Sequence, residues 1–523
     1  MKRVLPVGIQ SFEKLRIDGN IYVDKTSYID DLVRNGSYYF LFRPRRFGKS
    51  LFLSTLEAYF RGRKELFSGL AISNTEKEWT SYPVIKIGFG GSDYSLDGQL
   101  EAQIDMILTL TEEEYGIRKR FSNPAQRLTD LICSLHEQSG HGVVILIDEY
   151  DKPILDALYG ENESRNRAVL RSFYGPLKEC DRHIRFCFLT GITRIDHVSI
   201  FSGLNQLDDI STSDSYSAIC GITEKELVGV FSEELEALAK VKNVTIEDAG
   251  ARLKTMYDGY CFSKKGEKVF NPFSVLLAFR EQDYGQYWFR TATPSSLIRQ
   301  LEHTPSFALS LIEERDVSVT DFTEFDSSSG KLLPLIYQSG YLTIKGYDPL
   351  FDTYRLGFPN QEVEKGFLNA LLPEFVSCKN ESTGMEVAEI QKAIINDDAD
   401  RIMSIITSLV SDIPTMIRKD MYENYYLSII HIIFRLVGFS VISELQSIYG
   451  RSDLTLSNST TVYLIELKMD RGRDPEACYR EGFEQIRNKG YATRYLASGR
   501  KVRVFTLLFS SEGKGVVGYR EAP

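Results

Sequence analysis

Short apolar runs alternate with longer amphipathic segments through the first part of the chain. Several of the runs have the length of strands and are rich in aromatic or β-branched residues: 37–42, 83–89, 143–148 and 184–191. Segments with helical spacing lie between them, such as LEAQIDMILTLTEEEYGI at 100–117. Because strands that alternate with helices favour a parallel sheet covered on both faces, we expect residues 1–215 to form an α/β domain.

The pattern becomes mainly helical after about residue 215. The segment TEKELVGVFSEELEALAKV is amphipathic, and similar segments follow it, which predicts a helical, winged-helix-like lid over 216–315. Residues 316–409 mix strand and helix fragments without a chemical signature, so we expect a connecting α/β region there. From 410 to 523 a helix, several strands, a second helix and a final strand at 501–510 predict a separate α/β domain.

One apolar stretch, 425–442, is long enough to raise the question of a membrane span. It contains His431, Arg435 and Gly438, and it is more typical of a buried helix that runs into a strand. The N-terminus lacks the apolar core of a signal peptide, and the seven cysteines form no CxxC pair. We therefore expect a soluble, cytoplasmic protein with reduced thiols and no membrane partner.

The segment RPRRFGKS at 43–50 follows the first predicted strand and precedes a predicted helix. It matches the end of a P-loop, or Walker A motif, although Arg43 stands where the general pattern has glycine. A glycine lets backbone N–H groups approach phosphate, a lysine neutralises its charge, and a serine hydroxyl ligates Mg²⁺. A lone GKS is equally typical of a solvated turn. We expect ATP and Mg²⁺ to bind at Arg46, Phe47, Gly48, Lys49, Ser50 and Leu51.

The apolar run at 143–148 ends in Asp148 and Glu149 and resembles a Walker B segment. Because parallel sheets bind ligands at the carboxyl ends of their strands, we expect Asp148 to hold Mg²⁺ and Glu149 to orient the attacking water. A helix-capping acidic cluster is the alternative. The run at 184–191 ends near Thr190 and Arg194, either of which would sense the γ-phosphate, and a plain strand-end turn with a surface arginine fits equally well.

Several blocks resemble the AAA-ATPase-like family of bacterial proteins: RPRRFGKSL, LIDEYDKPI, TGITRI followed by IFSGLNQLDDIS, and YDGYCF followed by NPFSVL. The resemblance covers about residues 5–290 and implies a P-loop NTPase sheet with a lid, with ATP as the ligand. Within that family Arg43 is expected, so it bears on affinity and hydrolysis rate more than on the identity of the site. Arg45 and Arg46 either assist the phosphates or are surface charge.

The last part of the chain offers Asp453 in GRSDLTL, followed by Glu466 and Lys468 in VYLIELKM. Because side chains alternate along a strand, Glu466 and Lys468 share one face, and a neighbouring strand can bring Asp453 beside them. Such a set can hold Mg²⁺ against a scissile phosphate while the lysine positions water and stabilises charge. On its own, ExK in a strand is more typical of a charge pair on an exposed edge.

This arrangement resembles the PD-(D/E)XK nuclease superfamily over about residues 410–515, with Ser452 in the place of the proline. The resemblance implies a restriction-endonuclease-like α/β fold with Asp453 and Glu466 as metal ligands. It also implies accessory roles for Glu423 on the preceding helix and for Gln485 and Tyr491 on the following one. Glu423 is alternatively a helix cap.

The net charge of −10 argues against a globally basic nucleic-acid-binding protein, so any nucleic-acid site must be local. From Gln485 to Ser511 there is no Asp or Glu, and the segment carries Arg487, Lys489, Arg494, Arg500, Lys501 and Arg503. Such a segment suits contacts to a phosphate backbone, and it equally suits a solubilising surface.

Together these features predict an ATPase coupled to a Mg²⁺-dependent nuclease that acts on DNA or another nucleic acid. A role in defence or mobile-element biology follows from the resemblance alone. The alternatives are a nucleotide-dependent switch or scaffold with a catalytically silent nuclease fold, and a plain ATPase with a structural appendage. The sequence is compatible with an oligomer.

Overall fold

The computed structural model describes most of the chain: residues 3–195, 206–292, 314–325, 330–376, 383–396, 398–411, 422–437, 440–447, 450–457, 460–488, 495, 499–510 and 516–522. The chain divides into two compact units. The first comprises 1–292 and 314–363, and the second comprises 293–313 and 364–523. The region that we expected to connect the two domains is therefore shared between the units, with the division at residue 363.

A five-stranded parallel sheet forms the centre of the first unit. Its strands occur in the order β2 (Val84–Gly88), β3 (Val143–Asp148), β4 (Ile184–Gly191), β1 (Tyr38–Phe42) and β5 (Asp208–Asp209). Every residue of β1 is buried, as expected for a continuous apolar run covered on both faces. The predicted α/β fold class is confirmed here, and all four strands that we expected are present.

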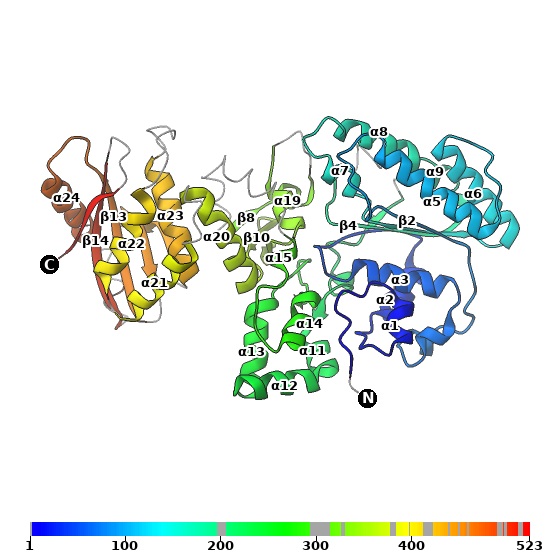
Figure 1. Ribbon diagram of the computed structural model, residues 1–523, viewed down its shortest axis with the longest axis horizontal. Helices are drawn as coiled ribbons and strands as arrows, with labels where there is room; N and C mark the ends of the chain where they lie inside the picture. Colours follow the sequence, from blue (N-terminus) through cyan, green and yellow to red (C-terminus); the bar gives the residue numbers. More distant parts are fainter. Residues whose placement is uncertain are drawn as a thin grey trace. The chain divides into compact units, whose positions relative to one another are not determined.

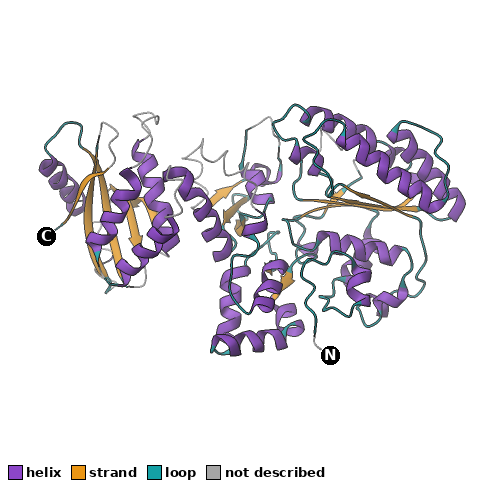
Figure 2. Ribbon diagram, in the orientation of Figure 1, coloured by secondary structure: helices purple, strands orange, loops and turns teal. Residues whose placement is uncertain are grey.

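Helices cover both faces of this sheet, as Figures 1 and 2 show. One side carries α1 (Phe12–Ile17), α2 (Thr26–Asn35), α3 (Lys49–Phe60) and α4 (Ile72–Thr75). The other carries α5 (Gln99–Tyr115), α6 (Pro124–Ser139), α7 (Lys152–Asp156), α8 (Glu163–Tyr174) and α9 (Pro176–Glu179). The short 3-10 helices are η1 (Lys64–Phe67), η2 (Asp181–His183) and η3 (Asp214–Tyr216).

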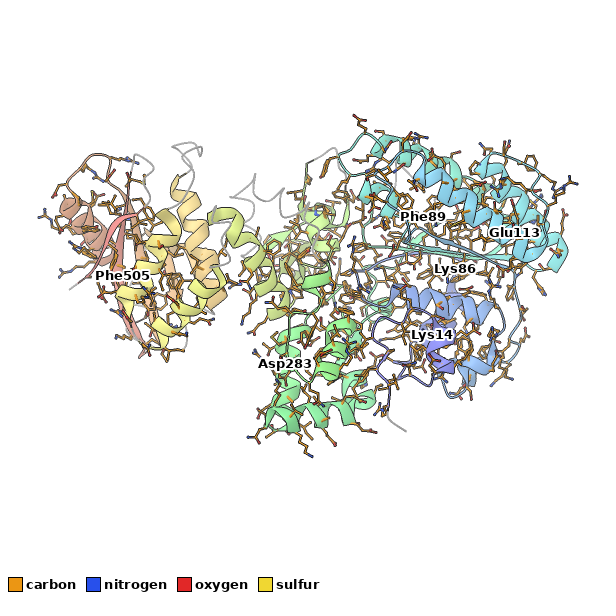
Figure 3. The ribbon with its side chains drawn as sticks, viewed as in Figure 1. Lys14, Lys86, Phe89, Glu113, Asp283 and Phe505 are labelled. Carbon is orange, nitrogen blue, oxygen red and sulfur yellow. The ribbon has the colours of Figure 1, made fainter. Side chains whose placement is uncertain are left out.

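An ion pair joins the sheet to one of these helices. Lys86 of β2, labelled in Figure 3, forms an ion pair of 2.8 Å with Glu57 of α3.

A helical region follows the sheet, as the sequence predicts. It contains α11 (Glu224–Val230), α12 (Ser232–Lys242), α13 (Ile246–Tyr257), α14 (Pro272–Glu281) and a two-stranded ladder of β6 (Ile222–Thr223) and β7 (Val269–Phe270). The amphipathic segment TEKELVGVFSEELEALAKV forms two helices, α11 and α12, which meet at Phe231, a residue that is 1% exposed in the core of this region. Leu5 and Val23 of the N-terminal segment pack against the same core.

The remainder of the first unit is a small antiparallel sheet with short helices. The strands are β8 (Arg315–Val317), β10 (Thr353–Gly357) and β9 (Thr343–Asp348), in that order. The helices are α15 (Phe289–Ala292), α18 (Val319–Thr323) and α19 (Leu333–Gln338). Helix α20 (Gln361–Val376) begins in the first unit and continues into the second.

The second unit is built on a mixed five-stranded sheet. Its strands occur in the order β11 (Ser440–Ser447), β12 (Gly450–Ser457), β13 (Thr461–Met469), β14 (Lys501–Phe509) and β15 (Val516–Glu521). All neighbours are antiparallel except β13 and β14. Its helices are α21 (Thr383–Ile395), α22 (Ala399–Ser411), α23 (Tyr422–Val437) and α24 (Pro475–Asn488). The expected helix, strands and fold class are confirmed, and β15 is an addition that the sequence pattern did not indicate.

The two faces of this sheet carry different helices. Val462 and Leu464 of β13 pack with Ile486 of α24, so the even-numbered residues of β13 face α24. Tyr463 lies 6.5 Å from Phe434 of α23, measured between ring centroids, so the odd-numbered residues face α23. The apolar stretch at 425–442 is therefore a helix that runs into a strand, as expected. In the part of the chain that the structure describes, no helix is long and apolar enough to cross a membrane.

Gly482 sets the distance between α24 and β14. A β-carbon at this position would lie 2.5 Å from Oγ1 and 2.6 Å from Cγ2 of the buried Thr506. We expect Gly482→Ala to lower the free energy of unfolding of the second unit by about 1–3 kcal/mol, because overpacking displaces the helix. Gly250→Ala in α13 is the control, since a β-carbon there meets nothing within 4 Å and alanine favours helix. Urea denaturation measures both, and an unchanged stability of Gly482→Ala would contradict the prediction.

Candidate active sites

The loop after β1 has the backbone conformation of a phosphate-binding turn. Arg46 has a φ of 68° and Gly48 a φ of 94°, both in the left-handed region, which a glycine adopts without strain. Helix α3 begins directly afterwards at Lys49, and no side chain caps it at Gly48. The first backbone N–H groups of α3 therefore remain available to an anion, and the helix dipole favours negative charge at this end.

A cavity of about 430 Å³ opens at this loop, a size that suits a small organic ligand. All six residues that we expected to bind nucleotide line it: Arg46, Phe47, Gly48, Lys49, Ser50 and Leu51. Glu149 also lines it. The apolar part of the wall comes from Ile9 and Ile21 of the N-terminal segment and from Ile222 and Leu276 of the helical region.

Lys49 is buried, with 8% of its surface exposed. Its Nζ donates hydrogen bonds to the carbonyl oxygens of Arg43 at 2.9 Å and Pro44 at 3.0 Å, and the ammonium group has further donor capacity. Burial lowers the pKa of Lys49, and the nearby carboxylate of Asp148 opposes this effect most strongly. The loop thus places a cation at the end of the sheet where Asp148 lies.

The carboxyl end of β3 presents oxygen atoms that suit a hydrated cation. Asp148 lies opposite Thr190 of β4, and Oδ1 of Asp148 and Oγ1 of Thr190 are both buried without a hydrogen-bond partner among the described residues. Buried polar atoms are normally satisfied, so these two indicate a missing partner such as a metal-bound water. The residues at this end of the sheet therefore fit Mg²⁺ together with the phosphates of ATP.

Glu149 occupies a strained position beside Asp148. Its φ is 55°, and a non-glycine residue in this region costs on the order of 1 kcal/mol, a strain often found at functional sites. Burial raises the pKa of Glu149, with Asp148 adding to the increase. This backbone turn directs the residue to the cavity that it lines.

Of the two residues considered as sensors of phosphate, the structure places Thr190 beside Asp148. Nε of Arg194 lies 3.3 Å from Oδ2 of Asp209 on β5, and the backbone N–H of Arg194 donates to Gln338. Arg194 is not among the residues that line the cavity. Its side chain is therefore engaged at the edge of the sheet in this structure.

Sequence reasoning assigned no role to Asp151, which lies two residues after Glu149. It is fully buried and accepts hydrogen bonds from the backbone of Ile192 at 2.9 Å, the backbone of Thr193 at 2.6 Å and the Thr193 hydroxyl at 2.8 Å. A β-carbon on Gly191 would lie 2.5 Å from its Oδ1. Asp151 thus fixes the turn after β4. The signal in the sequence was the pair of blocks DEYD and TGIT.

Arg43, the departure from the general P-loop pattern, is not among the residues that line the cavity. Its guanidinium donates to the carbonyl oxygens of Phe42 at 2.9 Å, Ser211 at 2.7 Å and Tyr216 at 3.1 Å, and it lies 4.2 Å from the centroid of the Phe262 ring. The side chain is fully buried, and burial lowers its pKa. Arg43 therefore joins the phosphate loop to the segment after β5.

We expect Arg43→Gly, which restores the common P-loop residue, to destabilise the first unit by about 3 kcal/mol or more. The substitution leaves buried carbonyls without donors and opens a cavity. Arg194→Gly is the matched control, because that side chain is partly exposed. Thermal denaturation followed by circular dichroism measures both variants. An Arg43→Gly protein with unchanged melting temperature would show that the arginine contributes no net stability.

The neighbouring arginines of the loop have different environments. Arg45 lines the cavity and is exposed, so it is placed to meet an anionic ligand. The guanidinium of Arg46 lies 5.0 Å from the ring centroid of Phe273 on α14, within the range of a cation–π contact. Both arginines thus lie at the cavity, and Arg46 also contacts the helical region.

In the second unit, Glu466 and Lys468 lie on the face of β13 that α24 covers. Glu466 is fully buried, and Nζ of Lys468 lies 3.5 Å from its Oε1. Lys468 also donates to Oε1 of Gln485 at 2.7 Å, so the expected neighbour on the following helix is present. Glu481, one helical turn before Gln485, lies 3.9 Å from Lys468 and was missed by sequence reasoning. Its spacing of four residues from Gln485 could have revealed it, because residues four apart lie on the same face of a helix.

Asp453 lies in β12, which pairs antiparallel with β13. The register pairs Leu454 with Ile465. Because the two strands run antiparallel, Asp453, which precedes Leu454 on β12, lies on the same side of this pair as Glu466, which follows Ile465 on β13. The side chain of Asp453 lies outside the described residues, as does that of Glu423 in α23, and Tyr491 lies outside them altogether. Among the side chains that are described, no group of three His, Cys, Asp or Glu residues is placed to hold a metal ion.

The basic segment after Gln485 is partly neutralised. Arg503 forms an ion pair with Glu521 of β15 at 2.7 Å, and Arg500 lies over the ring of Tyr495 at 5.4 Å. Lys501 is exposed at the start of β14. Arg503 is therefore occupied within the fold, because β15, which the sequence pattern did not reveal, supplies a carboxylate.

Comparison with known proteins agrees with this two-part arrangement. Residues 6–201 match the family described as predicted AAA-ATPase, and residues 421–517 match the PD-(D/E)XK nuclease superfamily. The chain is also 36% identical to an uncharacterized protein in the vnfD 5′ region of Azotobacter chroococcum mcd 1, over 531 aligned residues that cover 99% of this chain and 98% of the relative. The similarity to this relative thus extends over both units.

Proposed function

Because this chain belongs to the AAA-ATPase-like family, with an ATPase-like part followed by a PD-(D/E)XK nuclease-superfamily part, we propose that it hydrolyses ATP in the first unit and cuts DNA in the second. The observation that carries the proposal is that Lys49 lines a cavity of suitable size and lies near Asp148, whose Oδ1 is buried without a hydrogen-bond partner among the described residues. The pair of Glu466 and Lys468 under α24 supports the second activity.

In the first unit, the backbone amides of the loop and the Lys49 ammonium would hold the phosphates of ATP. The Ser50 hydroxyl and Asp148 would hold Mg²⁺, which when bound supplies positive charge against the phosphate oxygens. Glu149 would orient the attacking water, and Thr190 would sense the terminal phosphate.

In the second unit, Asp453 and Glu466 would hold Mg²⁺, which supplies charge at the scissile phosphate when bound. Lys468 would position the water nucleophile and stabilise the charge that develops on phosphate oxygen, while Gln485 holds the lysine in place. A role in defence or mobile-element biology stays a prediction.

The experiment is a parallel assay of ATP turnover and Mg²⁺-dependent plasmid cleavage with the full chain. We expect Lys49→Ala to lose ATP turnover but to keep the cleavage measured without ATP, and Lys468→Ala to lose only cleavage, because the two sites use different residues. A wild-type protein that hydrolyses ATP and binds DNA but does not cut it, with Lys468→Ala behaving identically, would favour a nucleotide-dependent scaffold.

A further inference from the structure

The phosphate loop is held from outside by a buried tryptophan. Trp288 is fully buried just before α15, and its indole Nε1 donates a hydrogen bond of 2.9 Å to the carbonyl oxygen of Arg45. The Trp288 ring lies 6.4 Å from the ring of Tyr260, which in turn lies 4.7 Å from the ring of Phe47 in the loop. The acceptor belongs to the peptide that precedes Arg46, the residue with positive φ.

A buried carboxylate fixes the backbone that carries this indole. Glu362, at the start of α20, is 1% exposed. Its Oε1 accepts a hydrogen bond of 2.6 Å from the backbone N–H of Trp288, and its Oε2 accepts one of 2.7 Å from the hydroxyl of Ser274 in α14. Burial raises the pKa of Glu362 to about 7. Burying a carboxylate costs free energy unless it is hydrogen-bonded, and both oxygens of Glu362 are. These hydrogen bonds indicate that the fold holds the backbone of Trp288 in a defined position.

Both residues stand where the chain leaves the first unit. This unit ends at Ala292 and again at Val363, so Trp288 precedes one crossing by four residues and Glu362 precedes another by one. The contact between them therefore joins two outgoing segments of the chain immediately before they enter the second unit. Through its indole, Trp288 also donates a hydrogen bond to the carbonyl oxygen of Arg45 in the phosphate loop.

From these contacts we infer that Arg45, Trp288 and Glu362 form a brace that passes the nucleotide state of the loop to the two outgoing segments. The inference rests on the proposed binding of ATP at the loop. A loop that closes its amides on phosphate must adjust the peptides around Arg46, and the adjacent carbonyl is the acceptor of the indole. Trp288 is thus a positioning residue for the loop, and its indole contacts the loop at the peptide that precedes Arg46.

The tryptophan content of the chain gives a direct test. The chain has two tryptophans, Trp79 and Trp288, so Trp79→Phe leaves Trp288 as the sole indole. We expect Mg·ADP and a non-hydrolysable ATP analogue to change the emission of Trp288 saturably, with the same Kd that calorimetry gives. Trp288→Phe, which leaves Trp79 among Tyr59 and Phe67, should give a flat response. Calorimetric binding with unchanged Trp288 emission would overturn the brace, whereas absence of binding would overturn the proposed function itself.

Activity measurements test the transmission. Trp288→Phe keeps the buried ring and removes the hydrogen bond, so we expect the KM for ATP to rise about fivefold with kcat nearly unchanged. A general loss of folding would instead lower kcat. In Glu362→Gln the effect of ATP on the plasmid cleavage rate should fall at least about threefold, while ATP turnover persists. A wild-type cleavage rate that is the same with and without ATP, or an undiminished ATP effect in Glu362→Gln, would contradict the inference.

Discussion

Replacing Lys49 by methionine should lower kcat/KM for ATP hydrolysis by about a hundredfold to a thousandfold, the usual result of removing one preorganised donor from a developing charge. Methionine keeps most of the length and apolar character of the lysine stem at a site that is only 8% exposed. It removes the cation and leaves the carbonyl oxygens of Arg43 and Pro44 without this donor. A coupled phosphate-release assay with the full chain measures the loss.

Lys86→Met is the matched control, because Lys86 (labelled in Figure 3) lies on β2 in the same sheet and outside the cavity. Its side chain is paired with Glu57. We expect its turnover to remain within about twofold of wild type, since an exposed ion pair contributes little. If Lys49→Met hydrolysed ATP at the wild-type rate, the loop would not be the nucleotide site. Plasmid cleavage in the absence of ATP serves as the check on folding.

The second large effect is expected at Glu466. Glu466→Gln is isosteric and removes the charge that would hold Mg²⁺, so we expect cleavage to fall at least about a thousandfold, with ATP turnover unchanged. Added Mg²⁺ should not restore the rate, because the amide oxygen is a weak ligand. Plasmid nicking at several Mg²⁺ concentrations measures the effect.

Two further variants separate the metal ligand from its surroundings. Lys468→Met should cause a comparable loss of cleavage while the affinity for Mg²⁺ remains, since the lysine acts on water and phosphate. Glu484→Gln, an exposed position on α24, should cleave at the wild-type rate. Full cleavage by Glu466→Gln would exclude this carboxylate as a metal ligand.

Local patterns predicted the elements that carry the candidate sites. The run at 143–148 is β3 to the residue, and 184–191 is β4, because fully buried parallel strands appear in sequence as continuous apolar runs. The spacing of GKS after β1 and of Glu466 and Lys468 within β13 is also local. The loop residues that we expected to bind nucleotide accordingly lie around one cavity.

Contacts between distant segments could not be predicted in this way. Arg43 is buried against Ser211 and Tyr216, well over a hundred residues away, and nothing in RPRRFGKS distinguishes a buried arginine from an exposed one. The pairing of Arg503 with Glu521 depended on β15, whose alternating pattern is weak. The pairing of Glu362 with Trp288 likewise appears only after the chain has folded.

The strand order of the first sheet has a consequence for charge. Because β4 lies between β1 and β3, the backbones that carry the loop and Asp148 are separated by about 10 Å, two strand spacings. The intervening strand thus separates the two groups. In the described structure Lys49 donates hydrogen bonds to loop carbonyls, and Oδ1 of Asp148 has no hydrogen-bond partner. A direct ion pair would have neutralised both groups, whereas in this arrangement the ammonium of Lys49 stays available to the proposed phosphate and the carboxylate of Asp148 to the proposed metal ion.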